Sequence, residues 1–304
     1  MSSITHEAYG LKGHQQILND FKEIKYANFK RNVGRSRVFE DDVSMGIAKR
    51  IATIFDEDHR NFSNMTSLPS HWYTMFFPEF TKQSELGRDG HAENNTLFPK
   101  FENFRRMGVG FRMRLFGSLK VGVQAKKTST IKSVELKNGS SGNFYLVTVS
   151  SLIESQGKII VEEEFDTVFR EPVSGKEVEQ QNRVREVQLS EAWRRDIIIS
   201  ESLVFRYSAV TWNAHRIHYD ADYSREVEGY GGLVQNGGLT INLLLNEVRE
   251  QNPMNISHAS IKLLGPVKVG EKLSIFGSKL TDKKVFCWVT NSFGKLCCSG
   301  EIEF

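Results

Sequence analysis

Cysteine, charge of one sign and long apolar runs are all scarce in this chain of 304 residues, and each scarcity excludes a class of protein. Three cysteines cannot build a disulfide framework and show no C-x-x-C spacing, so we expect a reducing compartment and no structural zinc. No stretch approaches the roughly 18 apolar residues that a membrane helix needs. A net charge of +3, without a basic tract interleaved with aromatics, argues against nucleic-acid binding.

The N-terminal segment is richer in basic than in acidic side chains. Three acids in the first 37 residues stand against seven bases: Lys12, Lys22, Lys25, Lys30, Arg31, Arg35 and Arg37. This balance is typical of a mitochondrial transit peptide. It also suits a basic surface helix at the start of a folded protein. We therefore treat residues 1–40 as a candidate targeting segment, which would place the protein in the mitochondrial matrix.

A repeated string indicates an internal duplication. Residues 116–122 read F-G-S-L-K-V-G, and residues 264–270 read L-G-P-V-K-V-G. Further along, Gly157-Lys158 precedes Glu164-Phe165, and Gly294-Lys295 precedes Glu303-Phe304 in the same order. Two ordered matches predict an N-terminal module at 41–170, a polar linker at 171–190 and a C-terminal module at 191–304.

Both modules are predicted to be rich in β-structure around a helix. Residues 109–115 alternate between apolar and small or charged side chains, which is typical of a half-buried strand. Residues 238–249 are strongly apolar over about three turns and predict a buried helix, with Asn236 as its N-cap. The aromatic run Trp72–Phe77 could line an acyl tunnel or form ordinary core, and core is slightly favoured. These patterns predict an α+β fold in which each antiparallel sheet curls round a central helix.

Reactive side chains are densest in residues 207–220, Y-S-A-V-T-W-N-A-H-R-I-H-Y-D, after an expected strand at Leu203–Tyr207. Glycines gather at 229–238, just before the apolar helix. Removal of a proton next to a thioester carbonyl places negative charge on the carbonyl oxygen, which free amides at a helix N-terminus can stabilise. Gly237 and Gly238 would allow a close approach of substrate to these amides.

Residues 208–218 resemble the S-G-D-x-N-P-x-H motif of the hydratase–dehydratase branch of the hot-dog superfamily. Residues 213–220 and 227–234 look closer still to fungal mitochondrial 3-hydroxyacyl-thioester dehydratases and to mesaconyl-CoA hydratase-like proteins. The N-terminal module agrees at 68–72, 84–91 and 105–107, so the resemblance covers roughly residues 65–304. It implies a double hot-dog fold, with two modules packed as a pseudo-dimer.

The resemblance also implies an activity: reversible removal of water from (3R)-3-hydroxyacyl thioesters to give trans-2-enoyl thioesters. His218 falls on the catalytic histidine and Gly237 on the oxyanion glycine, with Gly238 beside it. No metal or redox cofactor is expected. The implied partner is a thioester on acyl carrier protein, in mitochondrial type II fatty acid synthesis, or on coenzyme A. The first module is expected to bind the acyl group without being catalytic, and the oligomeric state stays open.

Two positions depart from the family motif. Asn213 takes the place of the catalytic aspartate, and Asn236 replaces the histidine before the oxyanion glycine. Asparagine cannot ionise, so Asn213 could orient the 3-hydroxyl or water, or simply form a turn. His215 or Asp220 could share the proton transfer with His218.

Several alternatives remain at this stage. The spacing of His215, His218, Asp220 and Asp222 could hold a metal ion, although Asp220 could instead cap a short helix at 221–227. The substrate could be a branched or dicarboxylic enoyl-CoA, such as mesaconyl-CoA, if the acyl tunnel were short and ended at an arginine. The chain could also be a non-catalytic subunit that binds acyl thioesters.

Overall fold

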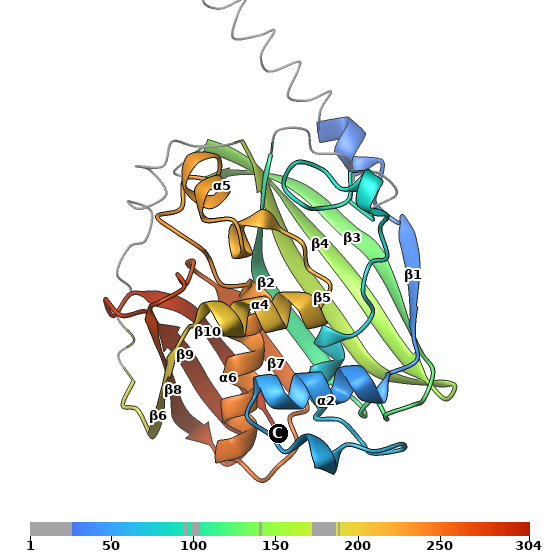
Figure 1. The fold of residues 1–304 in the computed structure, drawn as a ribbon, viewed down its shortest axis with the longest axis vertical. Helices are drawn as coiled ribbons and strands as arrows, with labels where there is room; N and C mark the ends of the chain where they lie inside the picture. The colour runs from blue at the N-terminus through green and yellow to red at the C-terminus, as the bar shows by residue number, and fades with distance from the viewer. Residues whose placement is uncertain (1–25, 94–96, 99–103, 140–141, 172–186, 188) are drawn as a thin grey trace, which may run out of the picture.

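A computed structural model describes residues 26–93, 97–98, 104–139, 142–171, 187 and 189–304 of the chain, and its strands form a single antiparallel sheet (Figure 1). The strand order is β1-β3-β4-β5-β2-β7-β10-β9-β8-β6. The strands are β1 Ser36–Asp41, β2 Arg105–Leu115, β3 Ala125–Gly139, β4 Gly142–Ser155, β5 Lys158–Arg170, β6 Trp193–Ile198, β7 His258–Leu263, β8 Lys272–Thr281, β9 Lys284–Thr290 and β10 Leu296–Glu303.

This order reads as the same five-strand unit written twice, in opposite directions. Each half begins with an edge strand, β1 or β6, and ends with a central strand, β2 or β7. The two central strands pair antiparallel, with Gly110 opposite Lys262 and Arg114 opposite His258. The predicted duplication is therefore present in the fold, and the two modules share one continuous sheet.

The repeated strings occupy equivalent loops in the two halves. The string at 116–122 leads from β2 towards β3, and the string at 264–270 leads from β7 towards β8. Both end in a glycine of positive φ, Gly122 at 77° and Gly270 at 87°. That backbone conformation disfavours side chains with a Cβ, which explains why glycine stands at the end of each string.

The helices lie on one face of the sheet (Figure 1). They are α2 Met45–Ile54, α4 Glu201–Val210, α5 Ala221–Glu226 and α6 Gly237–Gln251, with 3-10 helices η1 His59–Asn61, η2 Ser70–Met75, η3 Gln83–Glu85 and η4 Arg216–His218. Helix α6, predicted at 238–249, is buried along most of its length. The N-terminal module has the much shorter η2 in contact with α6, and Trp72 and Tyr73 of η2 are buried in the core as expected.

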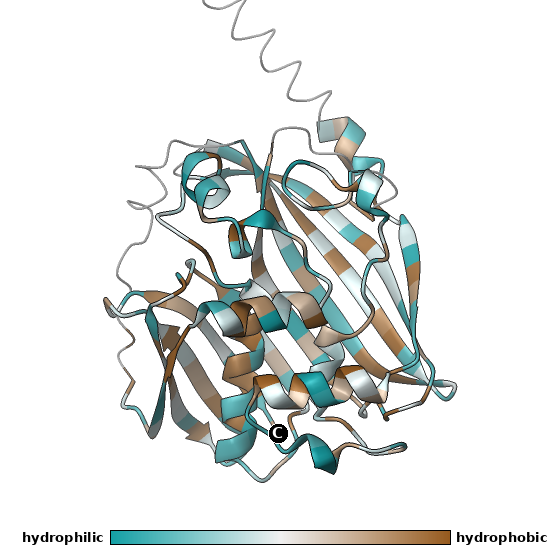
Figure 2. Ribbon diagram, viewed as in Figure 1, coloured by the Kyte–Doolittle hydropathy of each residue, from teal (hydrophilic) through white to brown (hydrophobic). Residues whose placement is uncertain are grey.

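One apolar core extends across both modules. Residues from the two halves, including Met113 of β2 and Ile261 of β7, belong to the same buried cluster. Apolar and polar residues alternate along the long strands β3 and β4, as the stripes in Figure 2 show. Alternation places the apolar side chains on the face that the helices cover. Among the described residues, no helix combines the length and apolar character required to cross a membrane.

The predicted strand at Leu203–Tyr207 is wrong, because these residues form part of helix α4. The hydroxyl of Ser200 accepts a hydrogen bond from the amide of Leu203 and caps the helix. The buried residues Val204, Tyr207 and Ser208 follow helical spacing rather than alternation. A short apolar run without its cap was too little to distinguish helix from strand.

The candidate targeting segment falls partly within the sheet. Ser36–Asp41 form the edge strand β1, which pairs with β3. Residues 1–25 lie outside the described part of the chain, as do 172–186 and 188 of the proposed linker.

A buried ion pair joins β2 of the first module to the segment that precedes α6 in the second. Arg105 Nε donates to Glu228 Oε2 at 2.9 Å, and the same guanidinium also donates to the Glu228 carbonyl. The Arg105 side chain is only 6% exposed, and its guanidinium lies 4.9 Å from the ring centroid of Tyr230. Because both charges are removed from water, each depends on its partner.

We therefore expect Arg105→Met to lower the free energy of unfolding by about 3–5 kcal/mol, since it leaves a buried carboxylate without its partner. Arg114→Met, at an exposed position of the same strand, is the matched control. Chemical denaturation followed by circular dichroism measures both. Equal stabilities of the two variants would show that the ion pair does not hold the modules together.

Candidate active site

His218 is the last residue of η4, in the segment that connects α4 to α5. Its ring is buried, and Nδ1 donates a hydrogen bond to the carbonyl oxygen of Val234 at 2.7 Å. A carbonyl can only accept, so the neutral ring carries its proton on Nδ1 and leaves Nε2 as a proton acceptor. Burial lowers the pKa of His218 to about 4, against an opposing effect of the Val234 hydrogen bond. The ring is therefore a neutral base at physiological pH.

The amides at the start of α6 follow directly after Val234 in the chain. The carbonyl of Asn236 accepts from the amides of Leu239 and Thr240, at 3.0 and 3.2 Å. The amides of Gly237 and Gly238 come before the first intrahelical hydrogen bonds, so the helix offers them no acceptor. They can therefore donate to a ligand that carries negative charge.

Asn236 occupies the N-cap position as predicted, but its side chain does not cap the helix. Its Oδ1 instead accepts from the hydroxyl of Ser208, at 3.3 Å, which links α4 to the start of α6. Its Nδ2 is buried and has no hydrogen-bond partner among the described residues. The sequence rule for N-caps failed here because a tertiary contact takes the side-chain oxygen.

Neither glycine could be replaced without displacing a neighbour. A Cβ on Gly237 would lie 2.9 Å from Leu263 Cδ1, and a Cβ on Gly238 would lie 2.7 Å from the Tyr207 hydroxyl. Both contacts are shorter than van der Waals distance. The glycines thus permit close packing at the helix start as well as close approach of a ligand.

His218, Gly237 and Gly238 line one cavity of about 420 Å³, which we call the histidine cavity. It lies between the two modules, because β2 and β7 also contribute to its wall. Its other lining residues include His91, Arg105, Arg106, Met107, Phe165, His215, Tyr230, Gln235, Thr240 and Leu263. A base and a set of free amides therefore line the same cavity.

Asn213 and His218 line a second cavity of about 810 Å³, the wide cavity. The side-chain oxygen of Asn213 accepts from the amide of His215 at 3.0 Å, so this residue forms the turn considered above. Its Nδ2 can still donate to a ligand. Asn213 can therefore orient a hydroxyl, but it cannot transfer a proton.

Asp220 and Asp222 do not join the histidines. The carboxylate of Asp220 caps α5 by accepting from the amide of Tyr223, at 2.9 Å, and it also pairs with Arg216, at 2.6 Å. The Asp222 side chain is 82% exposed. Asp220 thus has the structural role of a helix cap, and the metal site considered for these two histidines and two aspartates is not formed.

The N-terminal module contributes a loop that we had not assigned to the site. His91 lines both the histidine cavity and the wide cavity. Its Nδ1 lies 2.9 Å from Asp89 Oδ2, and its ring centroid lies 4.3 Å from that of His215. The motif that contains Asp89 and His91 supported the family resemblance, but nothing in the sequence places it beside residues more than a hundred positions away.

His215 lies between His91 and His218. Its ring centroid is 5.4 Å from that of His218, in an edge-to-face arrangement. Burial, together with the charges of His91 and His218, lowers the pKa of His215 to about 2. This ring therefore stays neutral in the physiological range.

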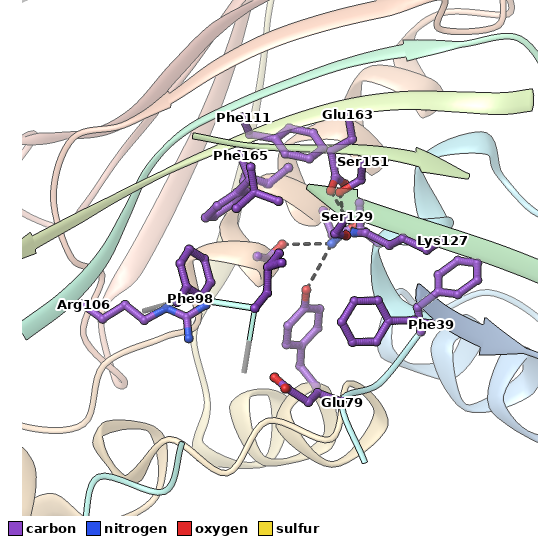
Figure 3. A pocket seen from close by; sticks show the side chains of 18 residues that line it. Phe39, Glu79, Phe98, Arg106, Phe111, Lys127, Ser129, Ser151, Glu163 and Phe165 are labelled. Carbon is purple, nitrogen blue, oxygen red and sulfur yellow. Dashed lines mark hydrogen bonds and ion pairs between the residues drawn. The ribbon is translucent and has the colours of Figure 1, made fainter. Parts of the chain in front are cut away.

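Figure 3 shows a third cavity of about 320 Å³, the inner cavity. It adjoins the other two at Arg106, which lines all three. Its wall combines phenylalanines with a buried ion pair, Lys127 Nζ to Glu163 Oε1 at 2.8 Å. Figure 3 shows Arg106 beside Phe98 at one end, and the guanidinium carbon lies 4.3 Å from the ring centroid. The inner cavity is therefore not a purely apolar tunnel.

Comparison with known proteins identifies relatives over most of the chain. The family model described as hydroxyacyl-thioester dehydratase type 2 matches residues 70–269. The mesaconyl-C(4)-CoA hydratase of Chloroflexus aurantiacus is 33% identical over 77% of this chain and 83% of its own length. The mitochondrial hydroxyacyl-thioester dehydratase type 2 of Schizosaccharomyces pombe is 38% identical, over only 24% of this chain and 25% of its own.

Solved structures share the fold at low sequence identity. A MaoC-like dehydratase from Phytophthora capsici superposes with a TM-score of 0.68, at 10% identity, over 89% of this chain and 96% of the other. The duplicated sheet around α6 is accordingly a double hot-dog fold, as predicted. The extent of the family match, and the residues it contains, show that this chain belongs to the hydroxyacyl-thioester dehydratase type 2 family and is a hydro-lyase.

Proposed function

We propose that the protein catalyses reversible loss of water from (3R)-3-hydroxyacyl thioesters to give trans-2-enoyl thioesters, in the histidine cavity. One observation carries the proposal: the neutral ring of His218 and the amides of Gly237 and Gly238 line the same cavity. A base close to an anion-stabilising helix end is what removal of a proton next to a thioester carbonyl requires.

The base, the backbone amides and the amide side chain of the site have separate roles in the proposed reaction. Nε2 of His218 accepts the C2 proton, because Nδ1 is committed to Val234. The thioester oxygen, which gains negative charge as the proton leaves, accepts from the amides of Gly237 and Gly238. Asn213 orients the 3-hydroxyl from the wide cavity. The charge then collapses to form the C2–C3 double bond, the C3–O bond breaks, and the hydroxyl leaves as water with a proton supplied by an acid in the cavity.

Two kinds of acyl substrate suit this reaction. The S. pombe relative has a mitochondrial name, which supports a 3-hydroxyacyl group on acyl carrier protein in mitochondrial fatty acid synthesis. The C. aurantiacus relative is named for mesaconyl-CoA, a dicarboxylic enoyl thioester. The inner cavity favours the second, since Arg106, Lys127 and Glu163 offer charge and hydrogen bonds that a long alkyl chain could not use.

We expect His218→Ala to lower the rate of dehydration about 10²–10⁴-fold, the usual contribution of a general base. Asn213→Ala should cost less, because that residue only orients the substrate. The spectrophotometric assay follows crotonyl-CoA and longer enoyl-CoA thioesters. Full activity of His218→Ala would refute the assignment, and acyl binding without turnover in the wild type would indicate a non-catalytic subunit.

The pH dependence should reveal the buried base. Because the pKa of His218 lies at about 4, the ring stays neutral and able to accept a proton until the pH falls to that value. We expect kcat/KM for dehydration of (3R)-3-hydroxybutyryl-CoA to be lost on the acidic side near pH 4, since this parameter reports the free enzyme. An acidic limb centred at 6.5, the ordinary histidine value, would contradict the burial of the ring.

Substrate preference should depend on Arg106. We expect kcat/KM to be higher for mesaconyl-CoA than for a ten-carbon enoyl-CoA, and Arg106→Leu to lower the value for mesaconyl-CoA about 10–100-fold by removing a charged hydrogen bond. Arg114→Leu, at a position of the same strand that lines none of the three cavities, is the control. A wild-type preference for the long chain, unaffected by Arg106→Leu, would instead favour the fatty-acid substrate.

A further inference from the structure

Three imidazoles lie in a row where the modules meet. The ring of His91, from the N-terminal module, is followed by those of His215 and His218 from the C-terminal module. All three line the histidine cavity. The proposed reaction assigns His218 as the base, which leaves the acid and the roles of the other two histidines unassigned.

Asp89 holds His91 in one orientation. The two oxygens of the carboxylate accept from the backbone amide and from Nδ1 of His91, each at 2.9 Å. Burial opposes ionisation of Asp89, but these hydrogen bonds and the adjacent imidazole outweigh it and hold the pKa of the carboxyl below its usual range. Because the ionised carboxylate accepts from Nδ1, Nε2 of the ring is left to interact with a ligand in the cavity. Carboxylates orient catalytic histidines in the same way in other enzymes.

The loop that carries this pair is fitted to the segment that carries His218. Gly90 has a φ of 89°, and a Cβ at that position would lie 1.9 Å from the Ala214 carbonyl oxygen. The amide of Arg216 donates to the Asp89 carbonyl at 2.9 Å, and its guanidinium donates to the Arg88 carbonyl at 3.1 Å. Contact this close, without room for a methyl group, fixes His91 relative to the catalytic loop.

The reaction needs a second proton-transfer group that the C-terminal module does not supply. Loss of water requires a base at C2 and an acid at the 3-hydroxyl. Asn213 cannot ionise, Asp220 is occupied as a helix cap, and the pKa of His215, at about 2, keeps that ring from carrying a proton to donate. Among the described residues, His91 and Arg106 are the other titratable side chains that line both cavities with His218, and a guanidinium does not give up its proton in proteins, which leaves His91.

We propose that His91, oriented by Asp89, is the acid that protonates the departing 3-hydroxyl while His218 takes the C2 proton, so that both modules contribute to one active site. The C2–H and C3–O bonds break and the C2–C3 double bond forms. The C2 proton goes to His218, and the hydroxyl leaves as water with the proton of His91. A proton passed from His218 to His91 through the product water restores the starting state.

This inference rests on the proposed function. It predicts that a change of leaving group in the substrate distinguishes the role of His91 from that of His218. Chloride departs without a proton, so elimination from (3R)-3-chlorobutyryl-CoA needs the base but not the acid. We expect His91→Gln to lower dehydration of (3R)-3-hydroxybutyryl-CoA about 10²–10⁴-fold, the range for one acid–base group, and to leave chloride elimination nearly unchanged. His218→Ala should lose both reactions.

The outcomes distinguish an acid role of His91 from a purely structural role and from no role. Equal loss of both reactions in His91→Gln would mean that the residue only supports the structure, and retained dehydration would mean that it has no role. Either result overturns the inference while leaving the proposed function intact. A wild-type protein that performs neither reaction would instead refute the proposed function. His59→Gln, at an exposed histidine remote from the cavities, is the matched control and should retain both reactions.

Asp89 acts through His91 and is a positioning residue. Asp89→Asn should lower kcat for dehydration with little change in KM and should spare chloride elimination, a combination that general unfolding would not produce. Dehydration by the wild type should also survive chelation with EDTA. Loss of activity on chelation would indicate that Asp89, His91 and His215 hold a metal ion, which would overturn the proton-transfer role.

Discussion

The hydrogen bond from His218 Nδ1 to the Val234 carbonyl is the interaction on which the site depends. It sets the tautomer, so that Nε2 is the basic nitrogen, and it connects η4 to the residues that lead into α6. The same short stretch of backbone therefore orients the base and delivers the free amides of the helix start. Burial completes the arrangement by keeping the ring neutral, which a solvated histidine near pH 6.5 would be only in part.

The duplicated fold is symmetric in its sheet but not in its helices. In the part of the chain that the structure describes, both modules contribute five strands, yet only the second has a long central helix, α6, and the first has η2 at a contact with it. A helix terminus of α6 can serve as an anion site because the chain before it is held by the loop from β7 to β8, by the His218 loop and by Arg105 of the other module. The first module provides instead most of the wall of the inner cavity and the loop at Asp89–His91.

Where the two modules meet, apolar packing is combined with buried polar contacts whose removal from water costs free energy. The Arg105–Glu228 pair and the fit of Gly90 against Ala214 both lie there, within reach of the histidine cavity. Buried charges of this kind contribute little net stability but penalise any arrangement in which their partners separate. We infer that they position the two halves of the site, and that the shared apolar core supplies the stability.

Local patterns in the sequence were sufficient to predict the repeat, the long strands and α6, because periodicity and paired glycines depend on the conformation of adjacent residues. The motif around His218 and Gly237 likewise predicted the helix start, which is confirmed, and a candidate base, which lines the same cavity as that helix start. The α4 segment was misjudged because a short apolar run fits either structure, and Asn236 failed as a side-chain cap because Ser208 takes its oxygen.

The approach of Asp89 and His91 to His215 and His218, and the polar wall of the inner cavity, were decided by tertiary structure alone. The contact between the histidines joins residues of separate modules and exists only once β2 and β7 have paired, whereas the polar wall is built from β2, β3 and β5 of the first module. Sequence order carries no information on such distances, whereas hydrogen-bond register in the shared sheet determines them.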